Sequence, residues 1–207
     1  MAHVFRAALR CALGSGLLLA PALAHAEEAQ AGAASCPAER AVYTLPSEEG
    51  DIHASFIPAR HWPSAASDLY FKLTTPRRDY WFSFAVSNGY SGITLLPVGN
   101  PYDPAAEDGG PASLLPETES PEDQDAELEL LAKLRFLPLD ANLMVAENPP
   151  SAGQEAPPYL MTPELGEALW YDVAMLTPDP EAEADSMPRG AFRITGCLAE
   201  APAKAWP

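Results

Sequence analysis

The chain has 207 residues and a formal net charge of −17, with 29 acidic residues against 12 lysines and arginines. A surface with that balance repels nucleic-acid backbones and anionic lipid headgroups, so the sequence argues against nucleic-acid binding. The length suits one domain with a substantial core.

Residues 1–26 have the pattern of a secretory signal peptide. Two arginines precede an apolar stretch at 12–23, and small residues stand where a signal peptidase cleaves. A membrane anchor is the alternative, but a span needs about 20 predominantly apolar residues and this stretch is shorter. We therefore expect cleavage after Ala26, or alternatively after Ala24. The mature protein would have no transmembrane anchor and would be periplasmic or secreted.

Two cysteines remain after such a cleavage, Cys36 and Cys197. Because an even number of cysteines in an oxidising compartment favours pairing, we expect a disulfide bond between them. Nearly the whole domain would lie inside the closed loop, which implies that the two ends of the fold are neighbours. The alternative is two free thiols, and a thiol-redox pair is disfavoured because the chain has no Cys-x-x-Cys motif.

The expected organisation is a signal peptide at 1–26, a disordered leader at 27–36, one β-rich domain at 37–200 and a C-terminal tail at 201–207. Within the domain, the acidic insertion at 103–120 has too little apolar surface to offset its ordering entropy, so we expect a mobile loop. Binding of a cation or a basic partner is the functional alternative for such acidic runs. We expect solvated loops also in two other segments of similar composition, 148–158 and 177–189.

Short segments rich in aromatic and β-branched residues, separated by turn residues, predict the strands. Alternation is clearest where Leu69, Phe71 and Leu73 share one face. About eight short strands with long Pro-rich connections predict a mainly β fold, an antiparallel β-sandwich or barrel-like single domain with one or two short helices. The expected strands are 41–46, 52–58, 68–75, a hairpin within 80–99, 141–147, 169–176 and 190–197.

The hairpin has a testable register. If Asn88 and Gly89 are the central residues of a type I′ turn, Phe84 lies opposite Ile93. One face of the ribbon is then bulky and apolar and the other small and polar, as expected for a sheet with one face on a core.

Trp81, opposite Leu96 in that register, breaks this division. Both side chains would point outward, where either another segment covers them or they form a ligand platform that Tyr90 extends. Arg77 and Arg78 could hold an anionic ligand, or pair with the acidic loops. The resulting candidate ligand surface consists of Trp81, Tyr90, Leu96, His61, Trp62, Arg77 and Arg78.

A helix is predicted over 121–135. Ser120 suits the cap, Pro121 the first turn, and leucines recur at helical spacing. The alternation of Leu134 and Phe136 leaves a strand as the alternative. The segment 162–169 predicts a short helical turn.

No catalytic, cofactor-binding or metal-binding residue can be nominated. His53 and His61 lack a zinc-binding pattern, and Ser91 lacks the second glycine of a nucleophile elbow. The acidic run at 179–185 lacks the glycine and the final glutamate of a calcium loop. The chain also has no glycine-rich phosphate loop.

The leading hypothesis is an exported, non-catalytic binding or interaction domain of a bacterial periplasm or cell envelope, with an unidentified protein or glycan partner. Its bacterial origin is inferred only from the Ala- and Pro-rich style of the chain. One alternative is a secreted hydrolase of envelope polysaccharide or peptide that uses paired carboxylates. Another is a structural envelope component that assembles through an edge strand.

Overall fold

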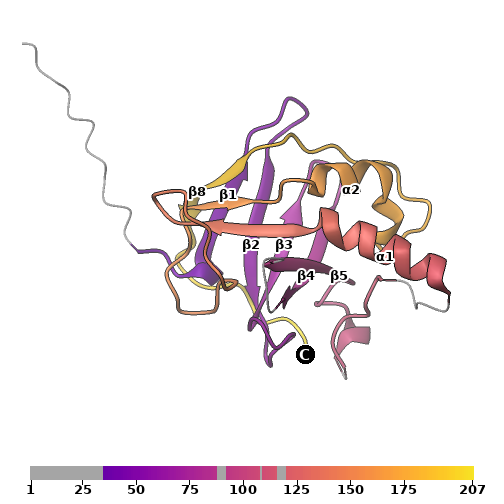
Figure 1. Ribbon diagram of the computed structural model, residues 1–207. Helices are drawn as coiled ribbons and strands as arrows, with labels where there is room; N and C mark the ends of the chain where they lie inside the picture. The colour runs from indigo at the N-terminus through magenta and orange to yellow at the C-terminus, as the bar shows by residue number, and fades with distance from the viewer. Residues whose placement is uncertain (1–34, 88–91, 108, 116–119) are drawn as a thin grey trace, which may run out of the picture. The chain divides into compact units, whose positions relative to one another are not determined.

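A computed structural model shows a closed barrel of eight antiparallel strands with two α-helices beside it (Figure 1). The structure describes residues 35–87, 92–107, 109–115 and 120–207. The expected signal peptide and all but the last two residues of the expected leader lie outside the described residues. The barrel is the predicted fold class, with the barrel form realised rather than the sandwich.

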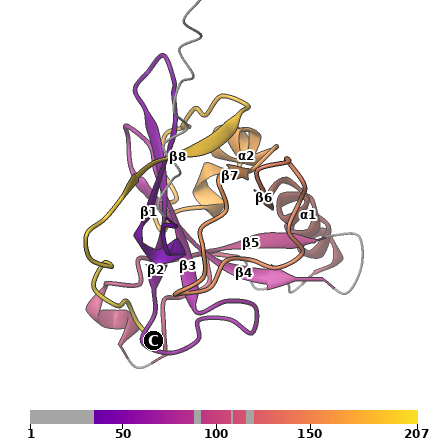
Figure 2. The ribbon, with the colours of Figure 1, turned by 90° about the vertical axis from the view of Figure 1, so that its left-hand side faces the viewer.

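Each strand pairs with the next one along the chain, and β8 pairs with β1 to close the barrel (Figure 2). Short 3₁₀ turns occupy 38–40, 104–106 and 173–175. The strands are β1 Ala41–Leu45, β2 Ile52–Pro58, β3 Leu69–Thr74, β4 Asp79–Val86, β5 Ile93–Val98, β6 Arg135–Leu139, β7 Tyr159–Met161 and β8 Ala191–Cys197, and the helices are α1 Pro121–Lys133 and α2 Leu165–Tyr171.

Local signals predicted α1 well. The Ser120 side chain accepts a hydrogen bond from the Asp123 N–H at 3.2 Å, and the Asp123 carboxylate accepts one from the Ser120 N–H at 3.0 Å. This capping box satisfies two N–H groups that the helix itself leaves without partners. The helix ends at Lys133 and β6 begins at Arg135. The predicted helix is therefore correct up to Lys133, and the alternative, a strand, applies to the residues from Arg135 onward.

Two predicted strands are wrong. The segment 169–176 completes α2 and a 3₁₀ turn, because Leu165, Leu169 and Leu176 are buried at helical spacing. The segment 141–147 is a turn that makes one isolated bridge, between Val145 and Leu139. The barrel uses β6 and β7 instead, and β7 is too short for its alternation to be recognised in the sequence.

The predicted pairs of the β4–β5 hairpin are also wrong, by two residues. Phe84 lies opposite Leu95, and Trp81 lies opposite Val98. The Ser87 N–H donates to the Gly92 carbonyl at 3.1 Å, so the connection is longer than a two-residue turn. The predicted Asn-Gly turn itself lies outside the described residues. A shift of two residues preserves the face of every side chain, which is why the predicted core face remains correct.

Aromatic side chains fill the barrel interior. Phe56 lies with its ring centroid 5.7 Å from Tyr43, 5.9 Å from Phe71 and 6.2 Å from Phe136. Leucines from both helices join the same buried cluster, and the helices lie side by side at the right of the barrel in Figure 1. In a small barrel such packing leaves a core rather than a lumen.

A second apolar cluster covers the outside of the barrel at β2, β3 and β4. Trp81, only 8% exposed, packs there with Tyr70 and Ala205. The 201–207 segment, expected to be a tail, crosses this face: Ala205 forms a parallel bridge with Ala59, and the Tyr70 hydroxyl donates to the Trp206 carbonyl at 2.8 Å. Of the two predicted alternatives for Trp81, coverage by another segment is therefore the one that the structure shows.

The predicted disulfide bond joins Cys36 and Cys197 across 161 residues, with a Cα–Cα distance of 5.9 Å. Cys197 lies opposite Ala41 in the β8–β1 ladder, so the bond stands at the point where the barrel closes.

Removing the disulfide with Cys36→Ala and Cys197→Ala together is expected to lower the free energy of unfolding by up to about 5 kcal/mol, because the unfolded chain regains a long open loop. Urea denaturation of the oxidised protein and the double variant measures the difference. An unchanged midpoint would show that the bond adds nothing to stability.

Burial raises the pKa of Tyr43, Tyr70 and Tyr80 above the ordinary value. The folded state then keeps protons that the unfolded chain releases above about pH 10, so stability is retained below that pH and falls as the pH rises further. Thermal melts across this range, with tyrosinate absorbance recorded in parallel, should show the buried phenols ionising only on unfolding. Their titration within the folded protein would contradict this expectation.

Candidate functional site

The most open seam of the barrel lies between β5 and β6. These strands pair at only two positions, Ile93 with Phe136 and Thr94 with Arg135. Further along β6, the Pro138 carbonyl accepts a hydrogen bond from the Ala146 N–H at 2.8 Å rather than from β5. The barrel wall therefore divides here between β5 and the chain after β6.

A cleft of about 660 Å³ occupies this division. Its size is within the range of pockets that hold drug-sized molecules. The residues that line it come from the end of β4, the start of β5, β6 and the following turn: Val86, Ser87, Gly92, Ile93, Arg135, Phe136, Leu137, Val145, Ala146, Glu147 and Asn148.

The turn after β6 presents apolar side chains beside the cleft. Leu143, Met144 and Val145, which we call the apolar tip, are each more than half exposed. Asp140 organises the turn, because its carboxylate oxygen accepts hydrogen bonds from the N–H groups of Asn142 and Met144, both at 2.8 Å. Hydrogen bonds from the turn backbone to Asp140 thus fix the conformation of the apolar tip, although its side chains are exposed to solvent.

Leu143 has a φ of 62°, a left-handed conformation that is costly for a bulky side chain. The Leu143 N–H donates to the Asp140 carbonyl at 3.0 Å and the Asp140 N–H to the Met144 carbonyl at 2.9 Å, so the surrounding bonds impose this conformation. Backbone strain of this kind is often found at functional sites.

Two opposite charges line the cleft, Arg135 and Glu147. The side chain of neither residue makes a hydrogen bond or an ion pair in the part of the chain that the structure describes. Two lysines elsewhere on the barrel are paired: Lys72 lies 2.8 Å from Asp79, and Lys133 lies 3.0 Å from Asp172.

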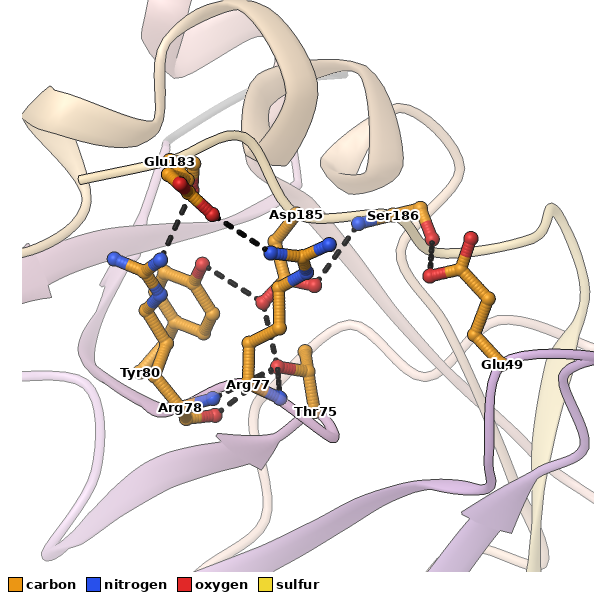
Figure 3. Close-up of polar contacts among 8 residues, drawn as sticks. All are labelled: Glu49, Thr75, Arg77, Arg78, Tyr80, Glu183, Asp185 and Ser186. Atoms are coloured by element: carbon orange, nitrogen blue, oxygen red, sulfur yellow. Dashed lines mark hydrogen bonds and ion pairs between the residues drawn. The ribbon is translucent and has the colours of Figure 1, made fainter.

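Arg77 and Arg78 lie in a different place, under the acidic segment 177–189 (Figure 3). The Arg77 guanidinium is 3.1 Å from the Glu183 carboxylate, and that of Arg78 donates to the Glu183 carbonyl at 3.0 Å. Of the two predicted roles, pairing with the acidic loops is the one that their contacts confirm.

Asp185 anchors the same segment to the barrel and is 2% exposed, unlike the solvated acids expected there. Its Oδ2 accepts hydrogen bonds from the Thr75 hydroxyl at 2.5 Å and from the Tyr80 hydroxyl at 3.1 Å (Figure 3). The charge of Asp185 adds to burial in raising the pKa of Tyr80. These residues form a structural anchor.

The structure disperses the remaining predicted site residues. His61 and Trp62 are exposed in the loop after β2, Leu96 is half-buried on β5, and Trp81 is covered. Tyr90 lies outside the described residues. Sequence reasoning missed the cleft, because the apolar run at 143–145 between Asp140 and Glu147 also fits the strand predicted at 141–147.

Among the described residues, no three or more His, Cys, Asp or Glu side chains gather in a way that could hold a metal ion. In the same part of the chain, no helix has the length and apolarity needed to cross a membrane. Comparisons with protein-family models, curated proteins and solved structures find no match to this chain.

Replacing Asp185 with alanine is expected to lower the free energy of unfolding by about 3 kcal/mol, because two buried hydroxyl groups lose their charged acceptor. Asp185→Asn keeps an acceptor and should cost less. Urea denaturation compares both with Glu183→Gln, an exposed change that should cost below about 1 kcal/mol. Equal effects of Asp185→Ala and Glu183→Gln would show that the anchor contributes little.

Proposed function

We propose that this protein is an exported, non-catalytic binding domain of the bacterial periplasm or cell envelope, and that the β5–β6 cleft with the apolar tip is its binding surface. The observation that supports this most is the pairing of a sizeable, mostly apolar cleft with a strained, hydrogen-bonded turn that keeps apolar side chains in solvent. Such exposure is unfavourable for the free protein and is relieved when a partner covers it.

The location part of the proposal is supported by two observations. The N-terminal sequence has the signal pattern, and a disulfide bond joins the ends of the barrel. A disulfide of this kind persists in an oxidising compartment.

The cleft chemistry fits binding better than the alternatives. Hydrolysis by paired carboxylates requires two acids facing one another across a cleft, and Glu147 is the single acid among the described residues that line this one. Assembly through an edge strand requires a free edge, whereas each of the eight named strands has a neighbour on both sides.

Nile red, a neutral apolar dye, tests the binding surface. Its fluorescence is expected to rise on binding the protein, and Val86→Glu with Val145→Glu should weaken binding at least about tenfold by placing charges in the cleft. Leu128→Glu is the matched control, because Leu128 is 64% exposed on α1 and does not line the cleft.

The double variant should keep its fold, since both valines are more than a third exposed. Circular dichroism and a thermal melt check this. Undiminished dye binding by the folded double variant, or an equal loss in the Leu128 control, would overturn the assignment of the cleft.

A further inference from the structure

The charges of the cleft point to the class of its ligand, an inference that rests on the binding function proposed above. Arg135 begins β6 and Glu147 follows the apolar tip, so separate segments bring them to one cleft. The guanidinium nitrogens and carboxylate oxygens are more than 4 Å apart, too far for an ion pair, and both side chains are exposed. Each charge is therefore available to a molecule that enters the cleft.

Arg135 and Glu147 are distinguished by their location in the cleft, and not only by their lack of partners. The side chains of Arg193 and Lys204 also have no partner among the described residues, but neither lines this cleft. At the β5–β6 seam, an unpaired guanidinium and an unpaired carboxylate line the same largely apolar cleft. The acid-rich chain could readily have supplied a partner for Arg135.

A ligand with a single charge would match only half of this arrangement. An anion would satisfy Arg135 and leave a carboxylate of like charge in the same cleft, and a cation would do the reverse. A zwitterion satisfies both side chains. The Arg135 guanidinium can donate two parallel hydrogen bonds to a ligand carboxylate, and the Glu147 carboxylate can accept hydrogen bonds from a ligand ammonium group.

The cleft volume and lining then select among zwitterions. About 660 Å³ lined by aliphatic side chains and Phe136 is within the range for a drug-sized molecule and is large for a single amino acid. Asn148 adds an amide that can both donate to and accept from a peptide bond.

We propose that the cleft binds short apolar peptides with free termini, with the peptide carboxylate at Arg135 and the peptide ammonium at Glu147. The apolar side chains of the peptide occupy the cavity beside Val86, Val145 and Phe136. Binding requires both termini and an apolar body.

Calorimetric titration with three probes tests this: leucyl-leucine, its N-acetyl derivative without the ammonium, and its amide without the carboxylate. The free dipeptide is expected to bind at least about tenfold more tightly than either blocked form, as expected for the loss of one charge-assisted contact. Equal affinity for all three probes, or no binding of any, overturns the proposal.

Two variants assign the termini. Arg135→Gln should weaken binding of leucyl-leucine and of its N-acetyl form about tenfold and leave the amide unchanged, whereas Glu147→Gln should weaken leucyl-leucine and the amide and leave the N-acetyl form unchanged. Arg193→Gln is the matched control, an exposed and unpaired arginine outside the cleft. Equal losses for all three probes in either cleft variant contradict the assignment.

The outcome is separable from that of the binding function itself. Nile red binding that depends on the cleft, together with no preference for free termini, removes the peptide assignment alone. Nile red binding that ignores the cleft removes both.

Discussion

Closure of the barrel between β8 and β1 is the constraint on which the rest of this structure depends. The two strands come from opposite ends of the fold, and their ladder, from Ala41 opposite Cys197 to Thr44 opposite Arg193, forms only when the whole intervening chain is folded. The disulfide at the end of this ladder reduces the entropy of the unfolded chain and so favours that long-range contact. A closed sheet also removes the exposed edges through which open sheets aggregate.

A barrel of this size has no room for a ligand inside, which places any binding site on its wall. The aromatic side chains from β1, β2, β3, β4 and β6 fill the interior, and the helices contribute leucines to the same core. The wall is covered in several places by the chain itself: 201–207 covers Trp81, and Asp185 ties 177–189 to Thr75 and Tyr80. The β5–β6 seam differs, because the strands pair only briefly there and the turn after β6 exposes its apolar tip.

The charged side chains differ in the same way between the covered parts of the wall and the β5–β6 seam. In the acidic segment 177–189, the buried carboxylate of Asp185 accepts hydrogen bonds from the barrel and Glu183 pairs with Arg77 at the surface. Lys133 on α1 binds Asp172 after α2. Ordered contacts of this kind make the acidic composition compatible with a packed barrel, since part of the charge is neutralised locally. At the cleft, the side chains of Arg135 and Glu147 have no such contacts within the described chain, and the proposed binding role of the cleft is built on this difference.

The sequence by itself determined the features that depend on neighbouring residues: the alternation that places Phe82 and Phe84 in the core and the Ser120 cap of α1. Cysteine parity predicted the disulfide as well, although its two residues lie 161 positions apart. Only the tertiary structure decided which residues pair. A two-residue shift in the hairpin leaves every face unchanged, so local patterning could not detect it, and a short apolar run such as 169–176 suits helix or strand until its neighbours are known. The cleft belongs to this second group, because its walls come from segments about fifty residues apart in the chain that meet only when β6 packs beside β5.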